Sequence, residues 1–144
     1  MSGIPLQTAS IRRRLAALSY EVLLVLAIVF VASFAYYGAA GPVLSGWSRH
    51  FFQAYLFFIA GLYFAVCWSR GGQTLPMKTW GLKLITTRST PVSVRRALAR
   101  YLLAWLSVFT FGAGFLWAAF DRDHQFLHDR LAGTMIVRCP PARR

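Results

Sequence analysis

The sequence predicts an all-α transmembrane protein, a small polytopic helical bundle that forms one membrane domain over residues 1–144. Hydrophobic residues make up 57% of the chain and charged residues 14%, whereas soluble domains have about 25% charged residues. Three apolar stretches are each long enough to cross a hydrocarbon core, which takes about 20 residues. A soluble core of this size would not bury so much apolar surface, and disorder is excluded by the same excess.

The first span is expected at residues 15–36, interrupted only by Glu21. Basic residues precede it at positions 12–14, as in a secretory signal peptide. The apolar run is longer than a usual signal-peptide core and contains an acid, so we interpret it as a true span. The second span is expected at residues 51–69, with no charge and one amide, Gln53. Its small residues Ala54, Gly61 and Ala65 predict a face of close helix approach.

The third apolar segment, residues 101–120, is uncharged and allows two interpretations. It crosses the membrane once, or it breaks at residues 112–114 and returns as a re-entrant helix hairpin. The second alternative is favoured because it keeps nearly all basic residues on one side. It also lets two β-prone runs, residues 80–85 and 133–137, pair as a short hairpin-like ribbon.

Basic residues predict the orientation of the chain. They precede the first span and crowd the loop at residues 70–100, whereas the loop at residues 37–50 has only Arg49. The positive-inside rule places the N-terminus, the second loop and, with a returning third segment, the tail at residues 121–144 in the cytoplasm. Basic residues beside spans touch anionic lipid, so we expect lipid rather than nucleic acid as the partner.

Glu21 and Arg14 are the main candidates for chemistry. They lie seven residues apart, so two helical turns bring them to nearly the same face. An acid at such depth costs on the order of 2–3 kcal/mol unless it is protonated, paired or facing water. Glu21 is therefore a candidate proton or cation site, or else a structural ion pair with Arg14 or Arg100.

Other motifs point to no enzymatic site. His124 and His128 have the spacing of two metal ligands on a helix, but no third ligand is assured, and we expect no metal. The Gly-rich loop at residues 71–84 lacks the spacing of a phosphate-binding motif. No arrangement typical of a catalytic triad or of paired carboxylates occurs. We expect neither an enzyme nor a cofactor, and we expect Asp129 to complement the Arg-rich loop or reach Arg14.

Four motifs together resemble the RDD family of bacterial membrane proteins, named for one Arg and two Asp. They are residues 14–21, 72–84, 114–121 and 128–134. By position, the family's Arg is Arg14, its first Asp is replaced by Glu21, and its second Asp is Asp129. Further motif positions are Gly72, Thr74, Lys78, His128, Gly133 and Thr134. Pro76 stands where the family often has Gly.

The resemblance implies a multi-pass protein of the bacterial plasma (inner) membrane. Family members are associated with transport, and cation/proton exchange is proposed for some. Two or three spans do not enclose a pathway alone, so a transporter would be a homo-oligomer or a subunit with a membrane-protein partner. The alternative is a non-transporting scaffold or accessory subunit that binds anionic lipid or a partner protein.

Overall fold

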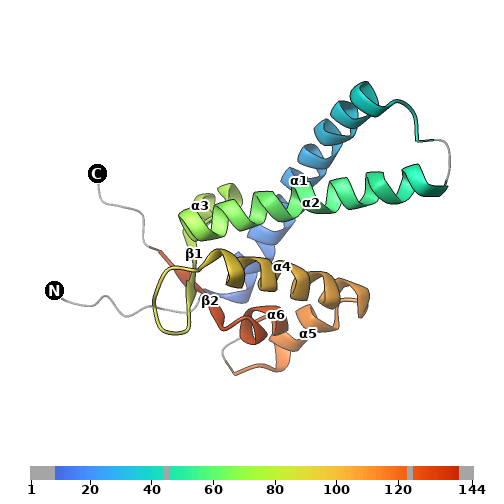
Figure 1. Cartoon of the computed structure of the whole chain (residues 1–144). Coiled ribbons are helices and arrows are strands. Elements are labelled where there is room, and N and C mark those ends of the chain that lie inside the picture. Colours follow the sequence, from blue (N-terminus) through green and yellow to red (C-terminus); the bar gives the residue numbers. More distant parts are fainter. Residues whose placement is uncertain (1–8, 44–45, 123–124, 140–144) are drawn as a thin grey trace.

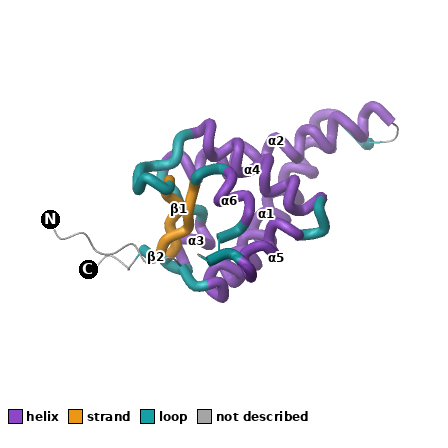
Figure 2. The backbone as a smooth tube through the Cα atoms, turned by 90° about the horizontal axis from the view of Figure 1, so that it is seen from below, coloured by secondary structure: helices purple, strands orange, loops and turns teal. Residues whose placement is uncertain are grey.

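The computed structural model describes residues 9–43, 46–122 and 125–139, which form six helices and a two-stranded ribbon (Figures 1 and 2). The elements are α1 (Ile11–Ala40), α2 (Gly46–Arg70), α3 (Leu75–Thr79), β1 (Leu82–Thr86), α4 (Val94–Phe109), α5 (Ala113–Phe120), α6 (Leu127–Leu131) and β2 (Thr134–Arg138). The expected helical bundle with one short β-ribbon is confirmed.

Two described helices, α1 and α2, are long and apolar enough to cross a membrane. They contain the predicted spans and extend beyond them at both ends, to 30 and 25 residues. The C-terminal half of α1 leaves large apolar side chains exposed, among them Phe30, Val31 and Phe34. Such a surface is stable against lipid and costly in water.

Helix α4 packs along α2 through a small residue on α2 (Figure 1). A Cβ added to Gly61 would lie 3.0 Å from the ring of Tyr101, so only glycine allows this approach without a shift. The Tyr101 hydroxyl donates to the carbonyl oxygen of Phe57 at 3.0 Å. The predicted close-approach face is used at Gly61 and Ala65, both buried, whereas Ala54 is exposed.

The third apolar segment is broken. Helix α4 starts before it and ends at Phe109, and α5 begins at Ala113. Phe111 and Gly112 between them have φ angles of 55° and 78°, the left-handed region that turns the chain. Gly114 then packs so closely on Ser107 that an added Cβ would lie 2.1 Å from its Oγ. The predicted break is confirmed, and the described residues contain no third helix of span length.

The ribbon joins the loop at residues 70–100 to the tail. Strand β1 pairs antiparallel with β2, with Leu84 opposite Ile136, which confirms the predicted pairing. Gly72 has a φ of 65°, and an added Cβ would lie 2.4 Å from the Leu84 carbonyl oxygen. The Leu84 amide donates to the Gly72 carbonyl at 2.7 Å. Strands β1 and β2 therefore lie at one end of the molecule, together with the start of α1 (Figure 1).

Candidate functional site

A cavity of about 330 Å³ lies where α1, α2 and α4 meet the ribbon and the tail. Helices α1 and α4 pack mainly on α2, and side chains of all three form its walls. Most lining side chains are apolar. The charged or titratable exceptions, apart from tyrosine, are Arg14, Glu21, Arg100 and His128. The structure thus brings together three of the predicted site residues and adds Arg100 to them.

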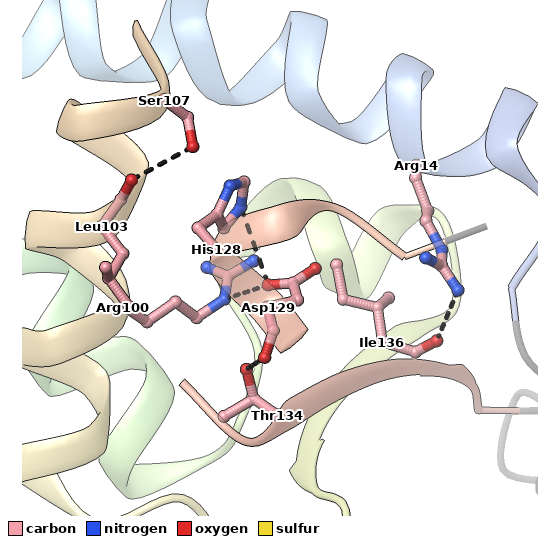
Figure 3. A network of polar contacts seen from close by, with 8 residues as sticks. All are labelled: Arg14, Arg100, Leu103, Ser107, His128, Asp129, Thr134 and Ile136. Atoms are coloured by element: carbon pink, nitrogen blue, oxygen red, sulfur yellow. Dashed lines mark hydrogen bonds and ion pairs between the residues drawn. The ribbon is translucent and has the colours of Figure 1, made fainter. Parts of the chain in front are cut away.

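Arg14 anchors the start of α1 to the ribbon. Its side chain is buried, and Nη2 donates to the carbonyl oxygen of Ile136 at 3.2 Å. The Ala9 amide donates to the same carbonyl at 3.3 Å. A buried guanidinium must find acceptors because its desolvation is costly, and the first turn of α1 is therefore fixed against β2 (Figure 3).

Glu21 is held by hydroxyl groups. The residue is buried, with only 8% of its surface exposed. The Thr74 hydroxyl donates to Oε2 at 2.5 Å and the Tyr63 hydroxyl donates to Oε1 at 2.9 Å. The suggested ion pair with Arg14 or Arg100 is not present among the described contacts of Glu21. The carboxyl group is therefore placed by two uncharged donors.

Thr74 owes its position to the turn that Gly72 makes. It is the N-cap of α3, and its Oγ1 accepts from the Met77 amide at 3.4 Å while its hydroxyl donates to Glu21. One hydroxyl group can serve as donor and acceptor at once. Lys78, a further motif position, is exposed and does not line the cavity.

Asp129 pairs with Arg100, which lines the cavity (Figure 3). The Arg100 Nε donates to Oδ1 of Asp129 at 2.5 Å, and the guanidinium carbon lies 4.2 Å above the Trp68 ring. Asp129 is 0% exposed, and its Oδ2 has no hydrogen-bond partner among the described residues. Of the arginines expected to meet Asp129, Arg100 fills that role at the start of the third apolar segment, and Arg14 contacts Ile136 instead.

His128 is neutral at pH 7. Burial lowers its pKa to about 4; nearby Asp129 raises it and Arg100 lowers it further. Its Nε2 lies 3.6 Å from Oδ1 of Asp129, and its ring stacks on Phe126 with centroids 5.5 Å apart. His124, which has the spacing of a second metal ligand beside His128, lies outside the described residues. Within the described part of the chain no group of three or more His, Cys, Asp or Glu is placed to hold a metal.

The remaining motif positions shape the turn that carries Asp129. Gly133 has a φ of 65° between α6 and β2. The buried Thr134 donates from Oγ1 to the Asp129 carbonyl oxygen at 3.2 Å. These contacts fix the backbone of Asp129, so Gly133 and Thr134 help to hold Asp129 in position for its ion pair with Arg100.

Two residues at the site were not predicted as site residues, Arg100 and Tyr63. In the sequence, Arg100 was considered as one possible ion-pair partner of Glu21. Its signal is that it is the last charge before the uncharged stretch at residues 101–120, much as Arg14 is the last basic residue before the first span. Arg14 and Arg100 both lie in the N-terminal half of their helices, α1 and α4, ahead of most of the apolar residues. Tyr63 carries no comparable signal in the sequence.

The arrangement can bind and release a proton or a small cation at Glu21, because the direct contacts of its carboxyl group are two neutral hydroxyl groups. The model of the RDD family matches residues 8–133, which confirms the resemblance found in the sequence. Comparisons with curated proteins and with solved structures give no match.

Proposed function

The chain belongs to the RDD family, and from this membership we propose that it is a proton-coupled membrane carrier in which Glu21 binds and releases the transported proton. Two apolar helices of span length make it a membrane-type protein. The coupled species is a small ligand or, in an exchange mechanism, a cation. The proposal depends on one observation, the placement of Glu21.

Glu21 is the only acid in α1, and it lines the cavity. Its hydrogen-bond donors are the hydroxyl groups of Thr74 and Tyr63. Glu21 makes no direct ion pair among its described contacts, although Arg14 and Arg100 line the same cavity. A carboxylate in an apolar layer is costly, on the order of 2–3 kcal/mol on insertion scales. Protonation removes this cost, and the cavity gives the proton a route. A purely structural acid would be expected to have a cation as its partner.

Arg14, Arg100 and Asp129 have supporting roles in this proposal. Arg14 and Arg100 line the cavity on the ribbon side of Glu21 and hold positive charge near it. Asp129 forms an ion pair with Arg100, which lines the cavity. We propose that Asp129 gates the site from this side, since loss of its contact with Arg100 would change the charge next to Glu21.

The proposed orientation places the ribbon end in the cytoplasm of a bacterial plasma membrane. Strand β1 of the basic loop and strand β2 of the tail share that end of the molecule (Figure 1), and we propose that basic residues there contact anionic lipids. A carrier built of two spans needs further walls for a pathway. We propose that a second copy or another membrane protein supplies them, and the exposed apolar side of α1 supports this.

A second candidate function is a membrane scaffold or accessory subunit. The observation that favours it is that the contacts of Glu21 join three elements, because Tyr63 lies on α2 and Thr74 begins α3. In that case the only role of Glu21 is to hold α1, α2 and the start of α3 together through its hydrogen bonds.

Proton flux in liposomes distinguishes the two candidates. A pH-sensitive dye inside the vesicles follows proton movement when Na⁺, K⁺ or Li⁺ is added outside. The carrier proposal expects flux from the native protein and none from an inserted, assembled Glu21→Gln variant. The matched control is Tyr63→Phe, which removes one contact but keeps the carboxyl group, and its flux should persist. If Glu21→Gln instead fails to assemble and the native protein moves no protons, the scaffold is favoured.

A further inference from the structure

The cavity is polar at one end and apolar along the rest of its length. On α1, Arg14 and Glu21 line it before Leu26, and on α4, Arg100 lines it before Val108. At a rise of about 1.5 Å per residue, the lining on α1 extends about 18 Å from Arg14 to Leu26. Its volume of about 330 Å³ is at the small end of ligand sites. The shape and polarity fit an amphiphile with a compact head.

The apolar part of the cavity is open at the side of the molecule. Val22, Leu26 and Val108 line it and are still 52%, 59% and 52% exposed. They lie on the apolar surfaces of α1 and α4, which a bilayer would cover. This opening would let an apolar tail enter the cavity from the hydrocarbon layer.

The polar end offers hydrogen-bond donors for an anion. Arg100 is only 6% exposed, and its one hydrogen bond among the described residues uses Nε. Its two terminal nitrogens have no hydrogen-bond partner in the described part of the chain. The guanidinium of Arg14 lines the same end. Planar guanidinium groups bind carboxylate, phosphate and similar anions through two parallel hydrogen bonds.

The charges at this end balance before any ligand binds. This end holds two arginines, Arg14 and Arg100, and two acids, Glu21 and Asp129, of which Arg100 and Asp129 form an ion pair. His128 is uncharged at pH 7 because burial lowers its pKa to about 4. An entering anion leaves one negative charge uncompensated in a buried site, which is costly. The groups that face Glu21 are Tyr63 and Cys67 on α2, Thr74 at α3 and Arg100 on α4. Among them, Glu21 is the group that can take up a proton and restore the balance.

We propose that the cavity binds a monoanionic amphiphile with a single apolar tail, its head at Arg14 and Arg100, and that Glu21 takes up one proton as the anion binds. This inference rests on the proposed function, since it names the coupled substrate of the same site. The proton comes from water and adds to a carboxylate oxygen of Glu21. No bond of the ligand changes.

Calorimetric titration of the protein in phosphatidylcholine nanodiscs tests the head group. The probe is decanesulfonate, a permanent monoanion, and the comparisons are decyltrimethylammonium and decanol, with empty discs as the blank. The anion should bind at least about tenfold more tightly than either comparison, the effect of one charge-assisted hydrogen bond. Equal binding of the three probes, or no saturable binding of the anion, overturns the proposal.

Two matched variants locate the ligand. Ala104 lines the cavity, and Ala104→Phe fills the space that the tail needs. Ala119 is exposed on α5 and does not line the cavity. Ala104→Phe should weaken decanesulfonate binding about tenfold, whereas Ala119→Phe should leave it unchanged. Undiminished binding by Ala104→Phe places the anion elsewhere and overturns the proposal.

Proton uptake is measured by repeating the titration in buffers of different ionisation enthalpy over a pH series. The native protein should take up about one proton per anion at the alkaline end, and Glu21→Gln should take up none. Binding without uptake in the native protein overturns the role of Glu21. Anion binding with uptake but without flux in liposomes supports this site and contradicts the carrier. Cation-driven flux without anion binding supports the carrier and contradicts this site.

Discussion

The hydroxyl of Thr74 lies 2.5 Å from Oε2 of Glu21, although the two residues are 53 positions apart. The turn after α2 thus reaches back to the one acid of α1. Because the same hydroxyl caps α3, the position of the carboxyl group depends on the fold of the loop. Any movement of α3 would move a hydrogen-bond donor of Glu21.

Thr74→Ala should therefore destabilise the protein, because it leaves the Met77 amide uncapped and removes a donor from a buried carboxyl group. The expected loss is about 2–3 kcal/mol in the free energy of unfolding. Thr74→Ser keeps the hydroxyl and should lose less. Denaturation in mixed micelles measures both. The control is Thr79→Ala at an exposed position, and an equal loss there would contradict the assigned role of Thr74.

The Arg100–Asp129 pair should show strong coupling. Arg100→Gln or Asp129→Asn alone removes one partner of a buried ion pair and should cost about 3–5 kcal/mol of unfolding free energy. The double variant leaves no uncompensated charge, so it should cost much less than the two losses together. A double-mutant cycle measured by denaturation tests this.

A matched control for that pair is the ion pair of Arg130 with Asp121, in which the Arg130 side chain is 55% exposed. The Arg130 guanidinium is screened by solvent, and Asp121, whose side chain is 3% exposed, keeps the Gln125 amide as a donor, so Arg130→Gln should cost less than Arg100→Gln. Simple additivity in the Arg100–Asp129 cycle would show that the buried contact carries no special stability.

His128 should make the protein sensitive to acid. Its pKa is about 4 in the folded state, below the value of about 6.5 expected in the unfolded chain. The unfolded state therefore binds more protons between these values, and stability falls as the pH is lowered through this range. The loss should reach about 3 kcal/mol.

Thermal unfolding across this pH range compares the native protein with His128→Asn, whose stability should change less. His50→Asn, at an exposed position, is the control and should follow the native curve. If all three proteins lose stability equally, groups other than His128 cause the acid sensitivity.

Gly114→Ala should disturb the helix hairpin, because the new Cβ would overlap the side chain of Ser107. Overpacking of this kind costs about 1–3 kcal/mol. Ser107→Gly in the same chain removes the overlap and should recover part of the loss. Gly38→Ala, which meets nothing within 4 Å in a helix, should be neutral or stabilising by up to about 1 kcal/mol. Unfolding of the three variants in micelles provides the comparison.

Hydropathy and turn chemistry predicted much of the fold, because both act over short stretches of chain. The spans follow from apolar runs, and the break at residues 110–112 lies beside the predicted glycines. The pairing of β1 with β2 was predicted because isolated short strands gain most from each other. The start of α4 at Val94 was not predicted, since polar residues extend that helix ahead of the apolar segment.

The partners of the charged residues were harder to predict. Tyr63 and Thr74 lie 42 and 53 positions from Glu21, and Arg100 lies 29 positions from Asp129. Such contacts depend on how α1, α2 and α4 rotate about their axes when they pack. The spacing of apolar residues along a helix and its composition constrain these rotations only weakly, because helices in lipid are apolar on most sides. The cavity depends on the same rotations.

The contact between Arg14 and Ile136 joins residues 122 positions apart, and this sets an order of events during synthesis. The spans emerge from the ribosome long before β2 does, so they enter the membrane while the tail is still being made. Until residue 136 is available, Arg14 lacks this acceptor and the cavity lacks one of its walls. The proposed ligand would therefore find an incomplete cavity in a newly inserted chain. Maturation of the chain is complete only when the last strand docks, well after both spans have crossed the bilayer.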